Sequence, residues 1–194
     1  EINADNNRQN LLINVADDTS KVLVVDGEGR WEFHYLWQAL LRDRSMKVKS
    51  VLFQQPRLNK ISKTELEKLN YPMSALPPLP MGEKEKDRDP LFEYDCIIRG
   101  DVTQEQLPKE ERVRLERYVA DRGGTLVVLA GKRAMPLAFL ADNDNPIAQP
   151  KDVEAVRQNQ DPLIRMLPIE EPRVAAPQEG FGVTLTEEGK QTQF

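Results

Sequence analysis

This chain of 194 residues contains little of the side-chain chemistry on which most catalytic and metal sites depend. Its single cysteine, Cys96, excludes an internal disulfide and a thiolate metal cluster. Its single histidine, His34, argues against a histidine-based zinc site. No apolar run reaches the roughly 20 residues of a membrane helix, and no signal-peptide pattern opens the chain. We therefore expect no cofactor, no metal and no direct insertion of this segment into a membrane.

The balance of charge narrows the classes of partner. The net charge is −5 and the isoelectric point is near 5.1. Because a nucleic-acid-binding surface requires a basic face, we expect no nucleic-acid partner. Apolar residues make up 39% and charged residues 30% of the chain, as in a soluble domain that buries a core. The length fits one domain, or one domain with an appended piece. Because the first residue is Glu1 and not Met, we expect a piece of a longer protein.

Alternation of apolar runs with amphipathic segments predicts the fold class. A strand is predicted at residues 22–26, where an apolar run stops at Asp26 before a glycine-rich turn. Apolar residues then recur at helical spacing from Phe33 to Leu41. Strands are also predicted at 48–53, 95–99 and 125–130, with helices between them. This pattern is typical of an α/β fold with right-handed crossovers. We predict a parallel sheet in the order 2-1-3-4.

Local signals place several of the helix boundaries. Ser62 and Glu65 have the spacing of a capping box, and Thr103 and Gln106 repeat it before a second amphipathic helix. The pair Gly123-Gly124 predicts the end of that helix. Residues 54–90 are rich in proline and charge, which favours a surface excursion over a lid above the ligand crevice. A last strand is predicted at residues 182–186.

The known nucleotide-binding and nucleophile motifs are incomplete here. Gly27 and Gly29 begin like a dinucleotide fingerprint, but Glu32 takes the position of the third glycine and would repel a pyrophosphate. No Walker loop occurs. Cys96 falls within an apolar strand, whereas a nucleophile stands at a strand-to-helix turn, so we interpret it as a structural cysteine. We expect His34, among aromatic neighbours, to pack at the surface or its boundary.

Charged residues gather where the predicted strands end. In an open parallel sheet these ends converge on one crevice, which is where the fold binds ligands. Mixed charges there could bind a polar ligand or a partner loop. They could also form a salt-bridged surface network, and this second interpretation is favoured because polar residues are common at the ends of loops. Treating Arg30 and Lys132 as exposed charges, we expect their joint replacement to change stability by no more than about 1 kcal/mol while weakening the binding of any ligand or partner. The candidate site residues are Asp26, Glu28, Arg30, Glu32, Asp101, Lys132 and Arg133.

The ordered set of these segments resembles one family. Residues 22–33, the pair Tyr94-Asp95, the pair Gly100-Asp101 and residues 122–131 look like a glutamine amidotransferase domain of large bacterial membrane proteins. Those proteins also carry von Willebrand factor A and aerotolerance-type modules. The likeness covers residues 22 to about 141, and residues 181–190 are similar to a late segment of the family. It implies a flavodoxin-like three-layer sandwich over residues 19–194. Residues 1–18 look like the last strand of a preceding immunoglobulin-like adhesion domain.

The chain departs from this family where the chemistry should be. Class I glutamine amidotransferases carry their cysteine in a Gly-x-Cys-x-Gly elbow, and here Leu129 takes the place of that thiol. No cysteine follows Cys96, and no His-x-Glu pair completes a triad. The resemblance therefore implies the fold without glutaminase activity. We expect a non-enzymatic module in the extracytoplasmic part of a membrane-anchored protein, binding a ligand, a protein partner or neighbouring domains. The alternatives are a hydrolase that uses carboxylates at the strand ends, and a structural spacer.

Overall fold

Within the part of the chain that the structure describes, four parallel strands form one sheet at the centre of the molecule. The computed structural model describes residues 19–56, 58, 60–80, 89–139, 161–167 and 190. The strand order is β2-β1-β3-β4 and every pairing is parallel, as the sequence predicts. Strands β1 and β2 extend beyond their predicted ends, while β3 and β4 are shorter than predicted. Their bounds are β1 Ser20–Glu28, β2 Met46–Gln54, β3 Cys96–Arg99 and β4 Thr125–Val128.

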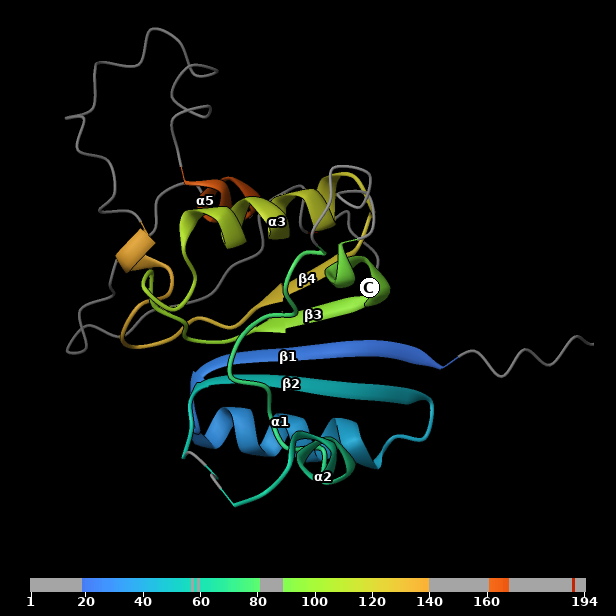
Figure 1. Cartoon of the computed structure of the whole chain (residues 1–194). Coiled ribbons are helices and arrows are strands. Elements are labelled where there is room, and N and C mark those ends of the chain that lie inside the picture. The colour runs from blue at the N-terminus through green and yellow to red at the C-terminus, as the bar shows by residue number, and fades with distance from the viewer. Residues whose placement is uncertain are drawn as a thin grey trace, which may run out of the picture.

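Helices cover both faces of this sheet, which gives an α/β sandwich of three layers with a flavodoxin-like arrangement (Figure 1). Helix α1 (Trp31–Arg42) packs on one face and α3 (Lys109–Ala120) on the other. Helix α5 (Pro162–Met166) lies against α3. The remaining short helices are α2 (Lys63–Lys68), η3 (Pro90–Glu93) and η4 (Leu137–Phe139). Among the described residues no helix is long and apolar enough to cross a membrane.

Strand β1 is apolar at consecutive positions because both of its faces are buried. Val22 and Val24 face α1 and pack with Phe33 of that helix. Leu23 and Val25 face the other way, into the core that contains residues of α3. Successive side chains of a strand point to opposite faces of the sheet. A strand that is covered on both faces therefore has apolar residues at consecutive positions.

One of the two predicted capping pairs begins a helix and the other does not. Ser62 accepts a hydrogen bond from the backbone N–H of Glu65, and the Glu65 carboxylate accepts one from Ser62, so this capping box starts α2. Thr103 and Gln106 bond each other in the same way. Their pair closes a turn, because α3 begins only after Pro108. The prediction of a helix start at Thr103 is therefore wrong, since local hydrogen bonds of this kind serve turns equally well.

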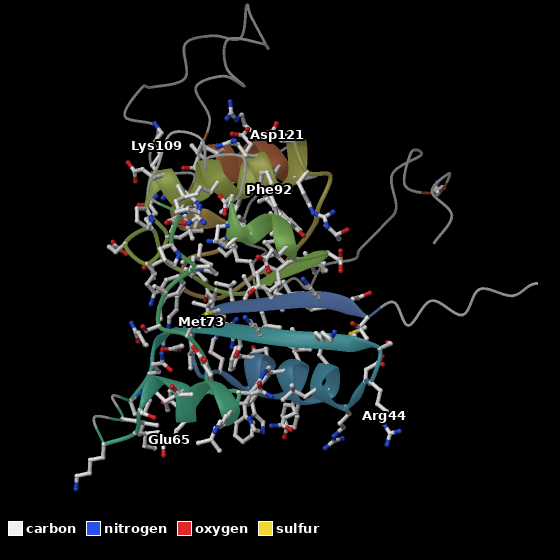
Figure 2. The ribbon with its side chains drawn as sticks, turned by 45° about the vertical axis from the view of Figure 1, so that its right-hand side comes forward. Arg44, Glu65, Met73, Phe92, Lys109 and Asp121 are labelled. Atoms are coloured by element: carbon white, nitrogen blue, oxygen red, sulfur yellow. The ribbon has the colours of Figure 1, made fainter. Side chains whose placement is uncertain are left out.

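The described part of the excursion after β2 runs along that strand. Met73 bridges to Val51 in parallel, with its N–H donating to Ser50 at 2.8 Å and its carbonyl accepting from Leu52 at 2.8 Å. Figure 2 shows Met73 beside the sheet and Glu65 on α2 at the outer edge of the molecule. The excursion therefore pairs with the outer edge of β2. The expectations for residues 1–18 and 182–186 lie outside the described residues.

Candidate functional site: the carboxyl ends of the strands

The sheet brings charged residues from three separate stretches of chain to one edge. Asp26 lies near the end of β1, Asp101 follows β3, and Arg133 follows β4. Arg30, Asp101 and Arg133 line a small recess there, and Asp26 lies behind it, bonded to Arg30. This convergence follows from parallel strand direction alone. What the residues do there depends on their contacts.

Asp26 and Arg30 form an ion pair beside the recess. Two hydrogen bonds join them, from Arg30 Nη2 to Asp26 Oδ2 at 2.7 Å and from Nε to Oδ1 at 3.2 Å. The backbone N–H of Gly27 donates to Asp26 Oδ1 at 2.7 Å. The side chain of Asp26 is 3% exposed and that of Arg30 is 16% exposed. The hydrogen bond to Asp26 raises the pKa of Arg30 above its ordinary value. This bidentate pair fixes the turn into α1.

Asp101 holds the turn that follows β4. Its carboxylate accepts hydrogen bonds from the backbone N–H groups of Arg133, Ala134 and Met135, each at 2.9 Å. Burial alone would raise the pKa of Asp101. The three N–H donors, aided by the positive charge of Arg30, outweigh that effect and hold the pKa below its ordinary value. Asp101 is thus kept ionised by structural contacts, which is the reverse of the raised pKa expected of a general acid.

Glycines make this close packing possible. A Cβ at Gly100 would collide with the carboxylate of Asp26, and one at Gly131 would collide with that of Asp101. The recess left between the residues has a volume of only about 30 Å³. That is room for one or two water molecules. Small-molecule sites have volumes of roughly 300–1,000 Å³. The recess is therefore closed to a metabolite in this conformation.

The remaining predicted charges are more exposed, and two of them, Glu28 and Arg133, line the recess. Glu28 pairs with Arg133 at 2.5 Å, with side chains 31% and 68% exposed. Glu32 is 64% exposed and 3.7 Å from Arg30, and Lys132 is exposed. The seven predicted residues thus divide into an inner group, Asp26, Arg30 and Asp101, and an exposed rim. The expectation that Arg30 is an exposed charge is wrong, because the buried carboxylate of Asp26 draws its guanidinium inward.

Two aromatic residues beside the rim were not among the predicted site residues. Trp31 is 74% exposed and Tyr35 is 64% exposed, and their rings stack with centroids 5.8 Å apart. They are separated by one helical turn at the start of α1 and lie off its apolar stripe. Their exposure could have been predicted from the sequence, because Phe33 and Trp37 belong to the apolar stripe of the helix and Trp31 and Tyr35 do not. We name Trp31 and Tyr35 the aromatic pair.

Cys96, Leu129 and His34, the positions weighed for amidotransferase-like chemistry, are all described by the structure. Cys96 begins β3 and packs half-buried on the α1 side of the sheet, where burial raises the pKa of its thiol. Leu129 donates its N–H to Arg99 at 2.8 Å, so the backbone at the expected elbow is still paired to β3. His34 is exposed, with its ring edge-on to Tyr35. Within the described ranges no group of three potential metal-ligating side chains occurs.

A second set of buried charges lies beneath α3 and was not predicted. Arg114 forms hydrogen bonds with both carboxylate oxygens of Asp89, at 2.7 and 2.8 Å. Arg99 and Arg112 lie over the ring of Phe139, at 4.8 and 5.4 Å from its centroid. Burial lowers the pKa of Arg99 to about 10. These contacts tie loops to the sheet and to α3, and we assign them a structural role.

Comparisons with protein families, with curated proteins and with solved structures found no match to this chain.

Proposed function

We propose that this domain is a non-catalytic interaction module with a glutamine amidotransferase-like fold, within a larger membrane-anchored protein. The proposal rests on the contacts and the small free volume at the carboxyl ends of the strands. Asp26 pairs with Arg30 and Asp101 accepts backbone hydrogen bonds, and the recess beside them has a volume of only about 30 Å³. A reaction would require an accessible nucleophile or a proton-transfer group beside space for a substrate.

The proposed interface comprises the rim and the aromatic pair. Trp and Tyr contribute most strongly to protein–protein interfaces when a partner covers them. Exposed charges around them set specificity and association rate. The rim offers both signs, Glu28 and Glu32 against Lys132 and Arg133, which fits a mixed-charge protein surface. The partner of this proposal is a neighbouring domain of the same parent protein.

Fluorescence of Trp31 tests the interface directly. The chain has two tryptophans, so Trp37→Phe leaves Trp31 as the single emitter. Addition of each separately purified neighbouring domain should shift its emission to shorter wavelength, in a saturable manner. The matched control, Trp31→Phe, retains the half-buried Trp37 and should show little change. An unchanged Trp31 emission with every neighbouring domain would contradict the proposal.

Ammonia release from glutamine tests the non-catalytic part of the proposal. We expect none above background from the purified domain. Ammonia release that disappears in Cys96→Ala would make Cys96 a nucleophile despite its place in the sheet. Release that persists in that variant would point to a different nucleophile. Both results would contradict the proposal.

A further inference from the structure

Strand β4 presents an unpaired edge within the described part of the chain. It pairs with β3 and with no other described strand. The N–H of Thr125 donates to Asp95 and that of Leu129 donates to Arg99. Because successive N–H groups of a strand point in opposite directions, those of Leu126 and Val128 point away from β3. An edge of this kind is a template for a further strand.

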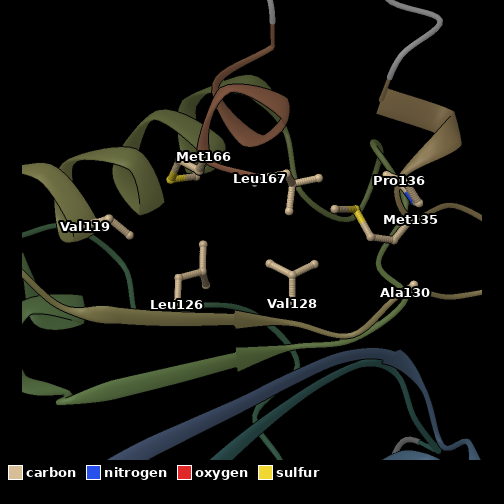
Figure 3. A pocket seen from close by; sticks show the side chains of 8 residues that line it. All are labelled: Val119, Leu126, Val128, Ala130, Met135, Pro136, Met166 and Leu167. Atoms are coloured by element: carbon tan, nitrogen blue, oxygen red, sulfur yellow. The ribbon is translucent and has the colours of Figure 1, made fainter. Parts of the chain in front are cut away.

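An apolar groove runs beside this edge. It lies between β4 and the layer formed by α3 and α5, and its volume is about 400 Å³ (Figure 3). Leu126 and Val128 form its floor, while Met166 and Leu167 lie opposite and Met135 closes one end. Methionine side chains adapt readily to the shape of an apolar occupant. A free edge next to an apolar groove suits an extended segment with apolar residues at alternate positions.

We propose that residues 181–186 of this same chain are the segment that pairs with β4 and fills the groove. These residues lie outside the described part of the structure, and the proposal rests on their sequence. Phe181, Val183 and Leu185 alternate with Gly182, Thr184 and Thr186, which is the pattern of a strand with one apolar face. The apolar set matches the lining of the groove, and the polar set would face away from it.

The connection is long enough and favours the segment over an external one. Leu167 lines the groove, and residues 168–180 separate it from Phe181. Fully extended, this connection spans roughly 40 Å, more than the length of the four-residue strand β4. A tethered segment has an effective concentration on the order of millimolar. A partner peptide or a second copy of the chain would have to outcompete it.

Hydrogen exchange of the whole chain tests the proposal at two amides. The N–H groups of Leu126 and Val128 should be protected at least about tenfold beyond an open edge. Protection should be lost in Val183→Asp with Leu185→Asp and retained in Thr184→Asp with Thr186→Asp, which adds the same charge to the other face. The N–H of Ile97, inside the sheet, reports whether each variant remains folded. Unprotected edge amides in the parent chain, or equal behaviour of the two variants, would overturn the proposal.

A second measurement does not require the variants to fold. In the parent chain with labelled methionine methyl groups, the ε-methyl groups of Met135 and Met166 should show NOEs to methyl groups of Val183 or Leu185. Their absence would overturn the proposal. Edge-amide protection that rises with protein concentration would also overturn it, because a second copy would then be the occupant.

Discussion

The strand-end recess and the β4 groove differ in both chemistry and openness. The recess gathers charges from β1, β3 and β4, yet those charges pair with one another and leave about 30 Å³. The groove is lined by apolar side chains and encloses about 400 Å³. Polar groups in a close-packed site gain most by satisfying one another. Convergence of charge at a strand edge therefore does not by itself indicate an open ligand site.

The largest test of this comparison is removal of the carboxylate of Asp101. Asp101→Ala would leave three N–H groups after β4 without an acceptor, so we expect a loss of about 3–5 kcal/mol in the free energy of unfolding. Urea denaturation of the variant and of the parent chain measures this difference in the free energy of unfolding. Glu32→Ala at the exposed rim is the control and should change stability by less than about 0.5 kcal/mol. Similar losses in the two variants would mean that the inner group is not a structural unit.

A second test separates an inner arginine from a rim arginine. Arg30→Ala leaves the buried carboxylate of Asp26 without its partner, and we expect a loss of about 3 kcal/mol. Arg133→Ala removes an exposed guanidinium and keeps the backbone N–H that Asp101 accepts, so its cost should be below about 1 kcal/mol. The two losses of stability are compared through the denaturant midpoints of the variants. Equal losses would contradict the division into inner group and rim.

The pH dependence of stability should show the inner group as well. The pKa of Asp101 is lowered by folding, so the folded state binds fewer protons than the unfolded state near and below pH 4. The stabilisation is therefore present above the unfolded pKa and is lost as pH falls through the folded pKa. Asp101→Asn removes this titration. Its melting temperature should fall less between pH 6 and pH 3 than that of the parent chain, measured by circular dichroism.

The smallest effect is expected in the groove. Met166 is half-buried by the described residues, and with residues 181–186 against it Met166→Ala should cost about 2 kcal/mol, whereas Leu163→Ala, at a fully buried position of α5, should cost about 3 kcal/mol. Thermal denaturation measures both. A cost for Met166→Ala well below about 1 kcal/mol would show that the groove stays open in the folded chain and would contradict its filling by residues 181–186. The expected result sharpens the comparison, because the recess is closed by pairing of charges and the groove by an apolar segment.

Two residue pairs with the same capping-box spacing have different outcomes in the structure. Ser62 and Glu65 form the predicted capping box, because both partners belong to one helical turn. Thr103 and Gln106 have the same spacing but close a turn, and Gln106 also reaches Gly27 across the sheet. Local spacing cannot distinguish the two outcomes, since the second depends on a contact between residues far apart in sequence.

The sequence by itself determined the α/β class, the parallel direction and the order 2-1-3-4, because apolar periodicity and chain connectivity are local properties. It also placed Asp26, Arg30 and Asp101 at one edge of the sheet. Only the tertiary structure decided that Arg30 turns inward to Asp26 and that Asp101 binds three N–H groups after β4. Those pairings depend on angstrom-scale distances between separate elements, and the glycines at 100 and 131 permit that approach.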